Sequence, residues 1–177
     1  MIKKITIFLF LVFIACDIPE EIYENPLDIE ANAENGINPP ALIFSPNKVE
    51  TSTGSNVSLK IFVLEIDSLA GSFIRINYDQ NKLAVNSVNV GDLLQEGGRN
   101  PIFFFEDNSA SGFVDIYTSF LGDPETASGT GTLAFIVFNV QAPGQSTVSY
   151  GSESELVNTD DIAIQLNGLG EVVINAQ

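Results

Sequence analysis

The side chains with the clearest capacity for chemistry in this sequence are paired carboxylates, which lie in or beside predicted turns. They are Glu106 and Asp107, Asp123 and Glu125, Glu153 and Glu155, and Asp160 and Asp161. Glycosidase chemistry requires two carboxyl groups about 5–10 Å apart across a cleft, one with its pKa raised by burial. Sugar clefts are usually lined with aromatic rings, above all Trp, and the sequence contains no Trp. We therefore interpret these carboxylates as solvated turn residues, name no catalytic residue and expect no enzyme.

The same acidic clusters contain the oxygen ligands that Ca²⁺ prefers. Asp79 and Asn81 have the spacing that begins an EF-hand loop, but Leu83 occupies the next ligand position. Val90 occupies the closing position, where that loop requires a bidentate Glu. These residues exclude an EF-hand. A structural Ca²⁺ in another loop stays open as an alternative, and we expect no other metal or cofactor.

The composition excludes several other classes of site. The chain has no His, and its only Cys is Cys16, so Ser-His-Asp catalysis, Cys-His catalysis and zinc sites built from His or several Cys are excluded. An intrachain disulfide is excluded as well. With 23 acidic and 7 basic residues and a net charge of −16, the surface would be repelled by nucleic-acid phosphates.

The amino terminus has the features of a secretory leader. Lys3 and Lys4 precede an apolar run over residues 5–15, which is shorter than the ~20 residues of a membrane-spanning helix. Cys16 follows directly after Ala15, and this pattern resembles the lipobox of bacterial lipoproteins. The resemblance implies that residues 1–15 are a signal peptide, that Cys16 is lipidated, and that the protein is anchored in the bacterial cell envelope, expected at the outer membrane. An ordinary signal peptide with an incidental Cys is the alternative.

Residues 16–40 are predicted to form a flexible tether. This segment is rich in acidic residues and Pro, lacks Lys and Arg, and shows no apolar periodicity. Like charges and prolines favour extended chains, so we interpret it as a spacer between the membrane and a folded domain. Binding of a ligand by the acidic cluster is the alternative.

The stretch from Gly71 to Leu94 predicts two strands and a turn. Ile74, Ile76 and Tyr78 alternate with Phe73, Arg75 and Asn77, so one set is expected to be buried and the other exposed. The turn comes at 79–81, and a second apolar run, Leu83, Val85, Val88 and Val90, follows it.

Similar patterns recur about every ten residues through the rest of residues 41–177. Val114, Ile116, Thr118 and Phe120, for example, alternate with Phe113, Asp115, Tyr117 and Ser119. The other predicted strands are 41–44, 57–66, 102–105, 131–140, 146–150, 162–166 and 171–174. Short strands separated by Gly, Pro and Asn turns predict one all-β sandwich domain.

Within this domain, Tyr78-Asp79 followed by Leu83, Val85, Val88 and Gly91-Asp92 resembles the cohesin family. The similarity extends at lower specificity through residues 129–140 and 170–174 and covers roughly residues 41–176. The resemblance implies a nine-stranded β-sandwich of jelly-roll topology that serves as a receptor for dockerin modules.

The expected function is therefore non-covalent binding of another protein through a sheet face, and a dockerin-like module is one candidate partner. The outward-facing residues Phe73, Arg75, Asn77, Asp115 and Tyr117 are the predicted partner-binding residues. Two alternatives stay open. One is a carbohydrate-binding module, which would need a planar strip of exposed aromatic rings, and the other is a glycan-active enzyme.

Overall fold

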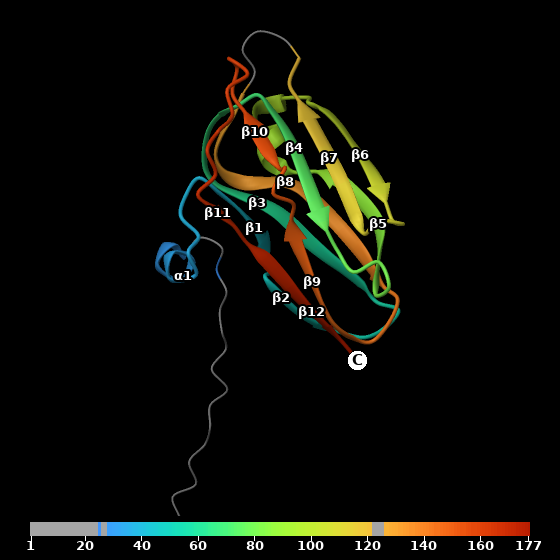
Figure 1. Ribbon diagram of the computed structural model, residues 1–177. Coiled ribbons are helices and arrows are strands. Elements are labelled where there is room, and N and C mark those ends of the chain that lie inside the picture. Colours follow the sequence, from blue (N-terminus) through green and yellow to red (C-terminus); the bar gives the residue numbers. More distant parts are fainter. Residues whose placement is uncertain (1–24, 26–27, 122–125) are drawn as a thin grey trace, which may run out of the picture.

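Two β-sheets pack face to face in the computed structural model, which describes residues 25, 28–121 and 126–177 (Figure 1). The five-stranded sheet has the order β11 (Gly168–Leu169), β1 (Ala41–Ser45), β3 (Asn56–Leu69), β8 (Ala127–Val140), β5 (Leu83–Val90). The larger sheet has the order β2 (Lys48–Thr51), β12 (Glu171–Ala176), β9 (Gly144–Tyr150), β4 (Gly71–Asn77), β7 (Phe113–Ser119), β6 (Ile102–Asn108), and β10 (Glu155–Val157) also pairs with β4.

The prediction of a nine-stranded all-β sandwich with jelly-roll topology is confirmed. In the part of the chain that the structure describes, nine strands have five or more residues, and β2, β10 and β11 are shorter additions. The predicted strand at 162–166 is wrong, because this segment makes only one isolated bridge, between Ala163 and Val157. Its apolar alternation instead reflects Ile164 and Leu166, which pack against the core from a loop.

Alternating side chains of both sheets form the core. Ile74, Ile76 and Tyr78 are buried as predicted. They join the inward-facing residues of β3 and β8, the two 14-residue strands that pair at the centre of the other sheet. All residues of the two core clusters, with everything packed against them, lie between residues 37 and 176. A chain that begins at residue 25 therefore keeps its complete core and is expected to fold on its own.

The Tyr78-Asp79 motif builds the turn from β4 to β5. The Asp79 carboxylate accepts a hydrogen bond from the Asn81 amide at 3.0 Å, and the Asp79 carbonyl accepts one from Leu83. Gly91 ends β5 so close to β8 that a Cβ atom there would lie 2.2 Å from the Thr132 carbonyl oxygen. The motif residues thus shape the backbone, with Tyr78 itself in the core.

Among the described residues, three helical segments accompany the sheets: α1 (Ile29–Glu34), α2 (Asp92–Gln95) and the 3₁₀ segment η1 (Glu96–Gly98). The α1 helix lies within the predicted tether, so the expectation of an extended chain is wrong at 29–34. Asp28 caps the helix by accepting a hydrogen bond from the Ala31 amide at 3.0 Å, and the Ala and Glu residues that follow are strong helix formers. None of the helices in the described ranges is long and apolar enough to cross a bilayer.

Tyr150 links the two sheets across the core. Its ring stacks on Phe44 at a centroid distance of 4.4 Å, and its hydroxyl donates a buried hydrogen bond of 2.8 Å to the Ile43 carbonyl. Phe44 and Ile43 belong to β1, in the opposite sheet.

We predict that Tyr150→Phe lowers the free energy of unfolding by about 1–3 kcal/mol, because the buried Ile43 carbonyl loses this donor. Urea denaturation of the chain from residue 25 measures the change. Tyr117→Phe, which removes a half-exposed hydroxyl, is the matched control and should stay within about 0.5 kcal/mol. Equal effects of the two variants would contradict this role for Tyr150.

The same residue predicts a pH dependence. Burial raises the pKa of the Tyr150 hydroxyl well above its ordinary value. The protonated form therefore stabilises the fold fully below pH ~10, the ordinary pKa of Tyr, and this stabilisation is lost as the pH rises toward the folded-state pKa. The alkaline decline in unfolding free energy should be shallower in Tyr150→Phe than in the natural chain, and an unchanged slope would contradict the assignment.

Candidate functional site

The outer surface of β4, β7 and β6 is the candidate site, and we call it the recognition face. Since side chains alternate along a strand, the residues that do not enter the core gather on this side. The strand registers align Phe73 with Tyr117 and Phe104, and align Arg75 with Asp115 and Glu106. The face comprises Phe73, Arg75, Asn77, Phe113, Asp115, Tyr117, Ser119, Ile102, Phe104 and Glu106.

Three rings cross the recognition face in a row, which we call the aromatic row. Phe104 stacks on Tyr117 with ring centroids 4.6 Å apart and planes at 12°, and Phe73 lies 5.2 Å from Tyr117 on the other side. Phe104 is 54% exposed, and the other two rings are half-buried. Cross-strand aromatic pairs of this kind stabilise a sheet and hold one another in place. The aromatic row is therefore a rigid apolar surface.

A network of ion pairs lies beside the aromatic row. Arg75 donates from Nε and Nη2 to the two oxygens of Asp115, each at 2.7 Å, and from Nη1 to Glu153 at 2.7 Å. The guanidinium carbon also lies 4.0 Å from the centroid of the Phe113 ring. Bidentate pairs of this geometry are among the stronger charge-assisted hydrogen bonds. All three nitrogens of the guanidinium are thus engaged within the protein.

This network involves two of the predicted partner-binding residues. Arg75 and Asp115 project to the outer face, where Asp115 is only 6% exposed and is paired with Arg75. Each already has a charged partner within the protein, and their contribution to partner binding stays a prediction. Tyr117, Phe73 and Asn77 remain accessible, at half-buried or exposed positions.

The electrostatics follow from the same contacts. Hydrogen bonding to Asp115 raises the pKa of Arg75 above its ordinary value, with Glu153 adding to the effect. A hydrogen bond from its own backbone amide, and then the one from Arg75, lower the pKa of the Glu153 carboxyl. The charged form of Glu153 therefore adds stability above the ordinary pKa of Glu, and this contribution is lost as the pH falls through its lowered folded-state value.

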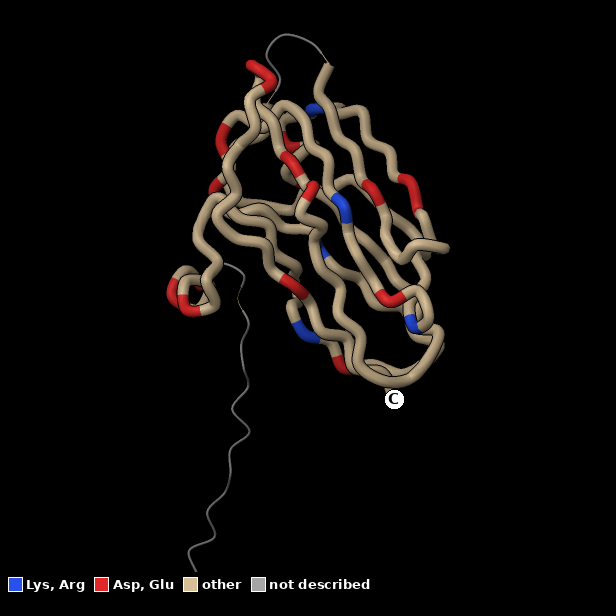
Figure 2. Tube along the Cα trace, in the orientation of Figure 1, with Lys and Arg blue, Asp and Glu red and all other residues tan. Residues whose placement is uncertain are grey.

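Beyond this network the recognition face is acidic. Glu106 and Glu155 are exposed on β6 and on β10 beside β4. Together with Asp115 and Glu153 they set four carboxylates against the guanidinium of Arg75. Figure 2 shows red segments on β6, β7 and β10 around the blue segment of β4. A cationic partner surface would be attracted to this face and an anionic one repelled.

The remaining carboxylates that the sequence singled out do not come together. Asp107 points to the inner side of β6 and accepts a hydrogen bond of 2.6 Å from the Tyr78 hydroxyl, and burial followed by this bond raises the pKa of Tyr78. Asp160 and Asp161 are exposed in a turn. Asp123, Glu125 and Cys16 lie outside the described residues. In the described part of the chain, no group of three or more His, Cys, Asp and Glu side chains could hold a metal ion.

A cavity of about 840 Å³ lies elsewhere, between α1 and the ends of β1, β2 and β12. Its lining is rich in amide side chains, including Asn35, Asn47 and Asn175, and the aromatic residue among its lining is the buried Phe44. Among the described residues that line it, none offers an exposed ring for stacking against a sugar.

Sequence reasoning missed Phe104, Glu106 and Glu155 as members of this site. The run 102–105 is apolar throughout, so its alternation does not reveal which Phe faces outward. Glu106, the residue after this run, carried the missing information. It lies two positions after Phe104 and therefore on the same side of the strand, and a charged side chain indicates the side that faces solvent. Glu155 reaches the face only through the pairing of β10 with β4.

Comparison with known proteins supports the fold. The family model described as the cohesin domain matches residues 43–172. A search of curated protein sequences finds no match. The similar solved structures include a non-cellulosomal cohesin from the archaeon Archaeoglobus fulgidus, with 17% identity, a TM-score of 0.64, and coverage of 77% of this chain and 90% of that one.

Two further similar structures contain a partner. The third cohesin of ScaC from Acetivibrio cellulolyticus, in complex with the ScaB dockerin, has 19% identity, a TM-score of 0.65, and coverage of 77% of this chain and 97% of that one. The OlpA cohesin from Clostridium thermocellum, in a type I cohesin–dockerin complex, has 16% identity, a TM-score of 0.63, and coverage of 77% and 98%.

We predict that the two carboxylates bound to Arg75 contribute unequally to stability. Asp115→Asn should lower the free energy of unfolding by about 1.5–3 kcal/mol, since it breaks a largely buried bidentate pair. Glu153→Gln should have a much smaller effect, since Glu153 is about half exposed and solvent screens its pair with Arg75. Urea denaturation measures both, and a larger loss for Glu153→Gln would show that the solvent-facing pair dominates.

Proposed function

This chain belongs to the cohesin family, and from that premise we propose that its sandwich binds a dockerin through the recognition face. Two of the similar structures are complexes of a cohesin with a dockerin. The family is a non-catalytic protein-binding module. The described members of the carboxylate pairs from the sequence lie on the surface of a sheet, in a turn, or in contact with Arg75 or Tyr78. We therefore propose binding without catalysis.

The observation that carries this proposal is the aromatic row. Phe104 is more than half exposed and lies on a rigid sheet. Its ring stacks on Tyr117, which in turn contacts Phe73. Aromatic side chains that are already ordered lose little conformational entropy on binding, and they are enriched among the residues that dominate interface energies. The surrounding carboxylates favour a partner that presents Lys or Arg around an apolar centre.

The geometry of the row favours a protein over a glycan. A sugar-binding platform needs rings whose faces lie open to solvent in one plane. Phe104 and Tyr117 instead turn their faces toward each other, at 12° and 4.6 Å. This stacking covers one face of each ring, so the pair does not form the open coplanar strip that a sugar requires, and it suits the side chains of a protein partner better.

We further propose that the domain is displayed from a bacterial membrane, expected to be the outer membrane. Support comes from the leader over residues 1–15, from Cys16 directly after it, and from the acidic segment up to residue 40. Two or more acyl chains would give stable anchoring where one chain is marginal. The segment between Cys16 and β1 would then hold the recognition face away from the bilayer.

The binding proposal predicts that Phe73→Ala, Tyr117→Ala and Phe104→Ala each weaken dockerin binding by more than about 1 kcal/mol, because each removes part of a preorganised apolar anchor. Isothermal titration of the chain from residue 25 against dockerin modules of the source's own secreted proteins measures the loss. Thr147→Ala, on the outward side of β9 in the same sheet, is the matched control and should bind normally.

Two results would count against the binding proposal. Unchanged affinity in all three aromatic variants would place the binding site elsewhere on the domain. Failure of every dockerin to bind the natural chain would refute the proposed function itself.

The anchoring proposal predicts that Cys16→Ser moves the protein from the membrane fraction to the soluble fraction, because the acceptor of the lipid is lost. Fractionation of bacterial cells that express the full chain, with labelled palmitate to follow acylation, measures this. Lys3→Ser with Cys16 retained tests whether a change elsewhere in the leader has the same effect. Equal membrane retention of Cys16→Ser and the natural chain would contradict lipid anchoring.

A further inference from the structure

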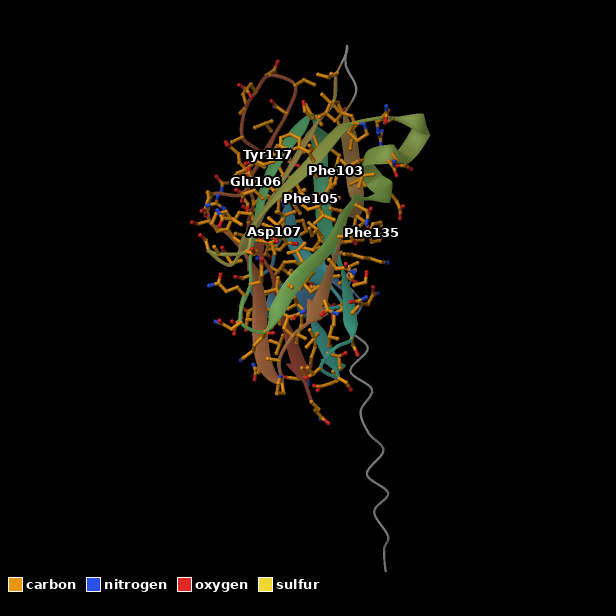
Figure 3. All side chains as sticks on the ribbon, turned by 90° about the vertical axis from the view of Figure 1, so that its right-hand side faces the viewer. Phe103, Phe105, Glu106, Asp107, Tyr117 and Phe135 are labelled. Carbon is orange, nitrogen blue, oxygen red and sulfur yellow. The ribbon has the colours of Figure 1, made fainter. Side chains whose placement is uncertain are left out.

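The edge strand β6 carries an unused pairing surface. Within the described part of the chain, β6 is the last strand of its sheet and pairs only with β7. Figure 1 shows β6 at the outer edge of the sheet, and Figure 3 looks onto this side of the sandwich. An edge strand presents a row of backbone N–H and C=O groups that can pair with another strand.

The register identifies the free backbone groups. Tyr78 donates from its amide to the Gly112 carbonyl, and Phe120 donates to Ala70, so even-numbered residues of β7 bond to β4. Along a strand, the N–H and C=O groups of successive residues point to opposite sides. The odd-numbered residues of β7 therefore bond to β6, and the register pairs them with its even-numbered residues. The N–H and C=O groups of Phe103, Phe105 and Asp107 therefore point to the free edge.

This edge is apolar on both sides. Ile102 and Phe104 are exposed on the recognition face, while Phe105 is 41% exposed on the inner side, where the sandwich is open. Figure 3 shows Phe103 and Phe105 between the two layers, with Tyr117 and Glu106 on one outer side and Phe135 on the other. Only at the end of the strand do Glu106 and Asp107 supply charge.

The other edges carry the features that usually prevent strand pairing. At one end of the larger sheet, β2 has four residues and carries Lys48 and Glu50, and β10 beside β4 has three residues and carries Glu155. In the five-stranded sheet, β11 has two residues, and β5 contains a register shift between Val85 and Ser87. The described strands thus leave β6 as the long, regular and apolar edge.

We propose that β6 pairs with β6 of a second copy of this chain, antiparallel and across a two-fold axis. Because the other described edges are protected, two copies can pair only through β6 of each. Once formed, this contact occupies β6 in both copies, so the assembly stops at a dimer. This proposal goes beyond dockerin binding and does not depend on it.

We place the two-fold axis at Phe104, so that Phe103, Phe104 and Phe105 of the two copies lie opposite one another. Phe103 then pairs with Phe105 of the other copy, and the reciprocal pair forms as well, which gives each of these residues backbone hydrogen bonds across the axis. Phe104 lies directly opposite its own counterpart, so the aromatic rows of the two copies become continuous. Glu106 lies opposite Ile102, and the two copies of Glu106 are separated by about 13 Å along the strand direction.

Charge opposes this dimer at long range, because each full chain has a net charge of −16. Salt screens such repulsion, with a Debye length of about 8 Å at physiological ionic strength. The dimer should therefore become tighter as sodium chloride rises. A contact held by attraction between opposite charges would instead become weaker, so the sign of the salt effect distinguishes the two.

Sedimentation equilibrium of the chain from residue 25, without any dockerin, tests the proposal over micromolar to millimolar concentrations. We expect a monomer–dimer equilibrium that shifts toward dimer with added salt. Phe104→Glu should weaken it at least about tenfold, because like charges would lie directly opposite each other. Thr147→Glu, with the same change of charge on β9, should follow the natural chain.

A disulfide probe checks the register. The chain from residue 25 lacks Cys16 and so contains no Cys, and Phe104→Cys introduces one thiol per copy. Directly opposed residues at such a position have Cα atoms about 4.5 Å apart, within the range of a disulfide. With oxidised glutathione as the acceptor of the two electrons, Phe104→Cys should form a covalent dimer rapidly, and Thr147→Cys should not.

Each outcome decides the proposal. A monomer at every concentration and salt level would overturn it. Dimerisation that Phe104→Glu and Thr147→Glu weaken equally, or cross-linking that is equally fast at both Cys positions, would show that the copies meet through a surface other than β6. Circular dichroism and thermal melting confirm that the exposed substitutions leave the fold intact.

Discussion

Burial of one set of alternating side chains between two sheets is the constraint on which the rest of this structure depends. Once Ile74, Ile76 and Tyr78 enter the core, Phe73, Arg75 and Asn77 have only the opposite side of the strand available. The same holds for β7 and β6. The recognition face is thus the necessary complement of the core, and no separate structural element is needed to build it.

The ion-pair network gives this face its character. Arg75 would be the natural anchor for an acidic partner, but its three nitrogens are engaged by Asp115 and Glu153. What remains for a partner is the aromatic row, with Glu106 and Glu155 beside it. The same cluster therefore sets both the rigidity and the charge of the recognition face. The contacts that hold the Arg75 guanidinium over the Phe113 ring also pair it with carboxylates, so its positive charge is not free to attract a partner.

Phe104 joins the two surfaces that we propose as interfaces. Its ring belongs to the face offered to a dockerin, and its strand is the edge offered to a second copy. Pairing at the edge would leave the outward surface of both sheets uncovered and would place two recognition faces on the same side of one continuous sheet. If the proposed dimer and the proposed anchoring both hold, two partners would be held side by side near the membrane.

The fold class, most of the strands and the sidedness of β4 and β7 could be predicted from the sequence, because period-two alternation is a local property of the chain. The prediction failed at 162–166, where apolar alternation serves packing from a loop, and at Ile29–Glu34, where a cap and good helix formers act without an apolar period. That Asp115 pairs with Arg75 and that Phe104 completes the aromatic row is visible only in the folded domain. Those facts depend on which strands become neighbours and in which register, and strand pairing is fixed by contacts between residues far apart in the chain.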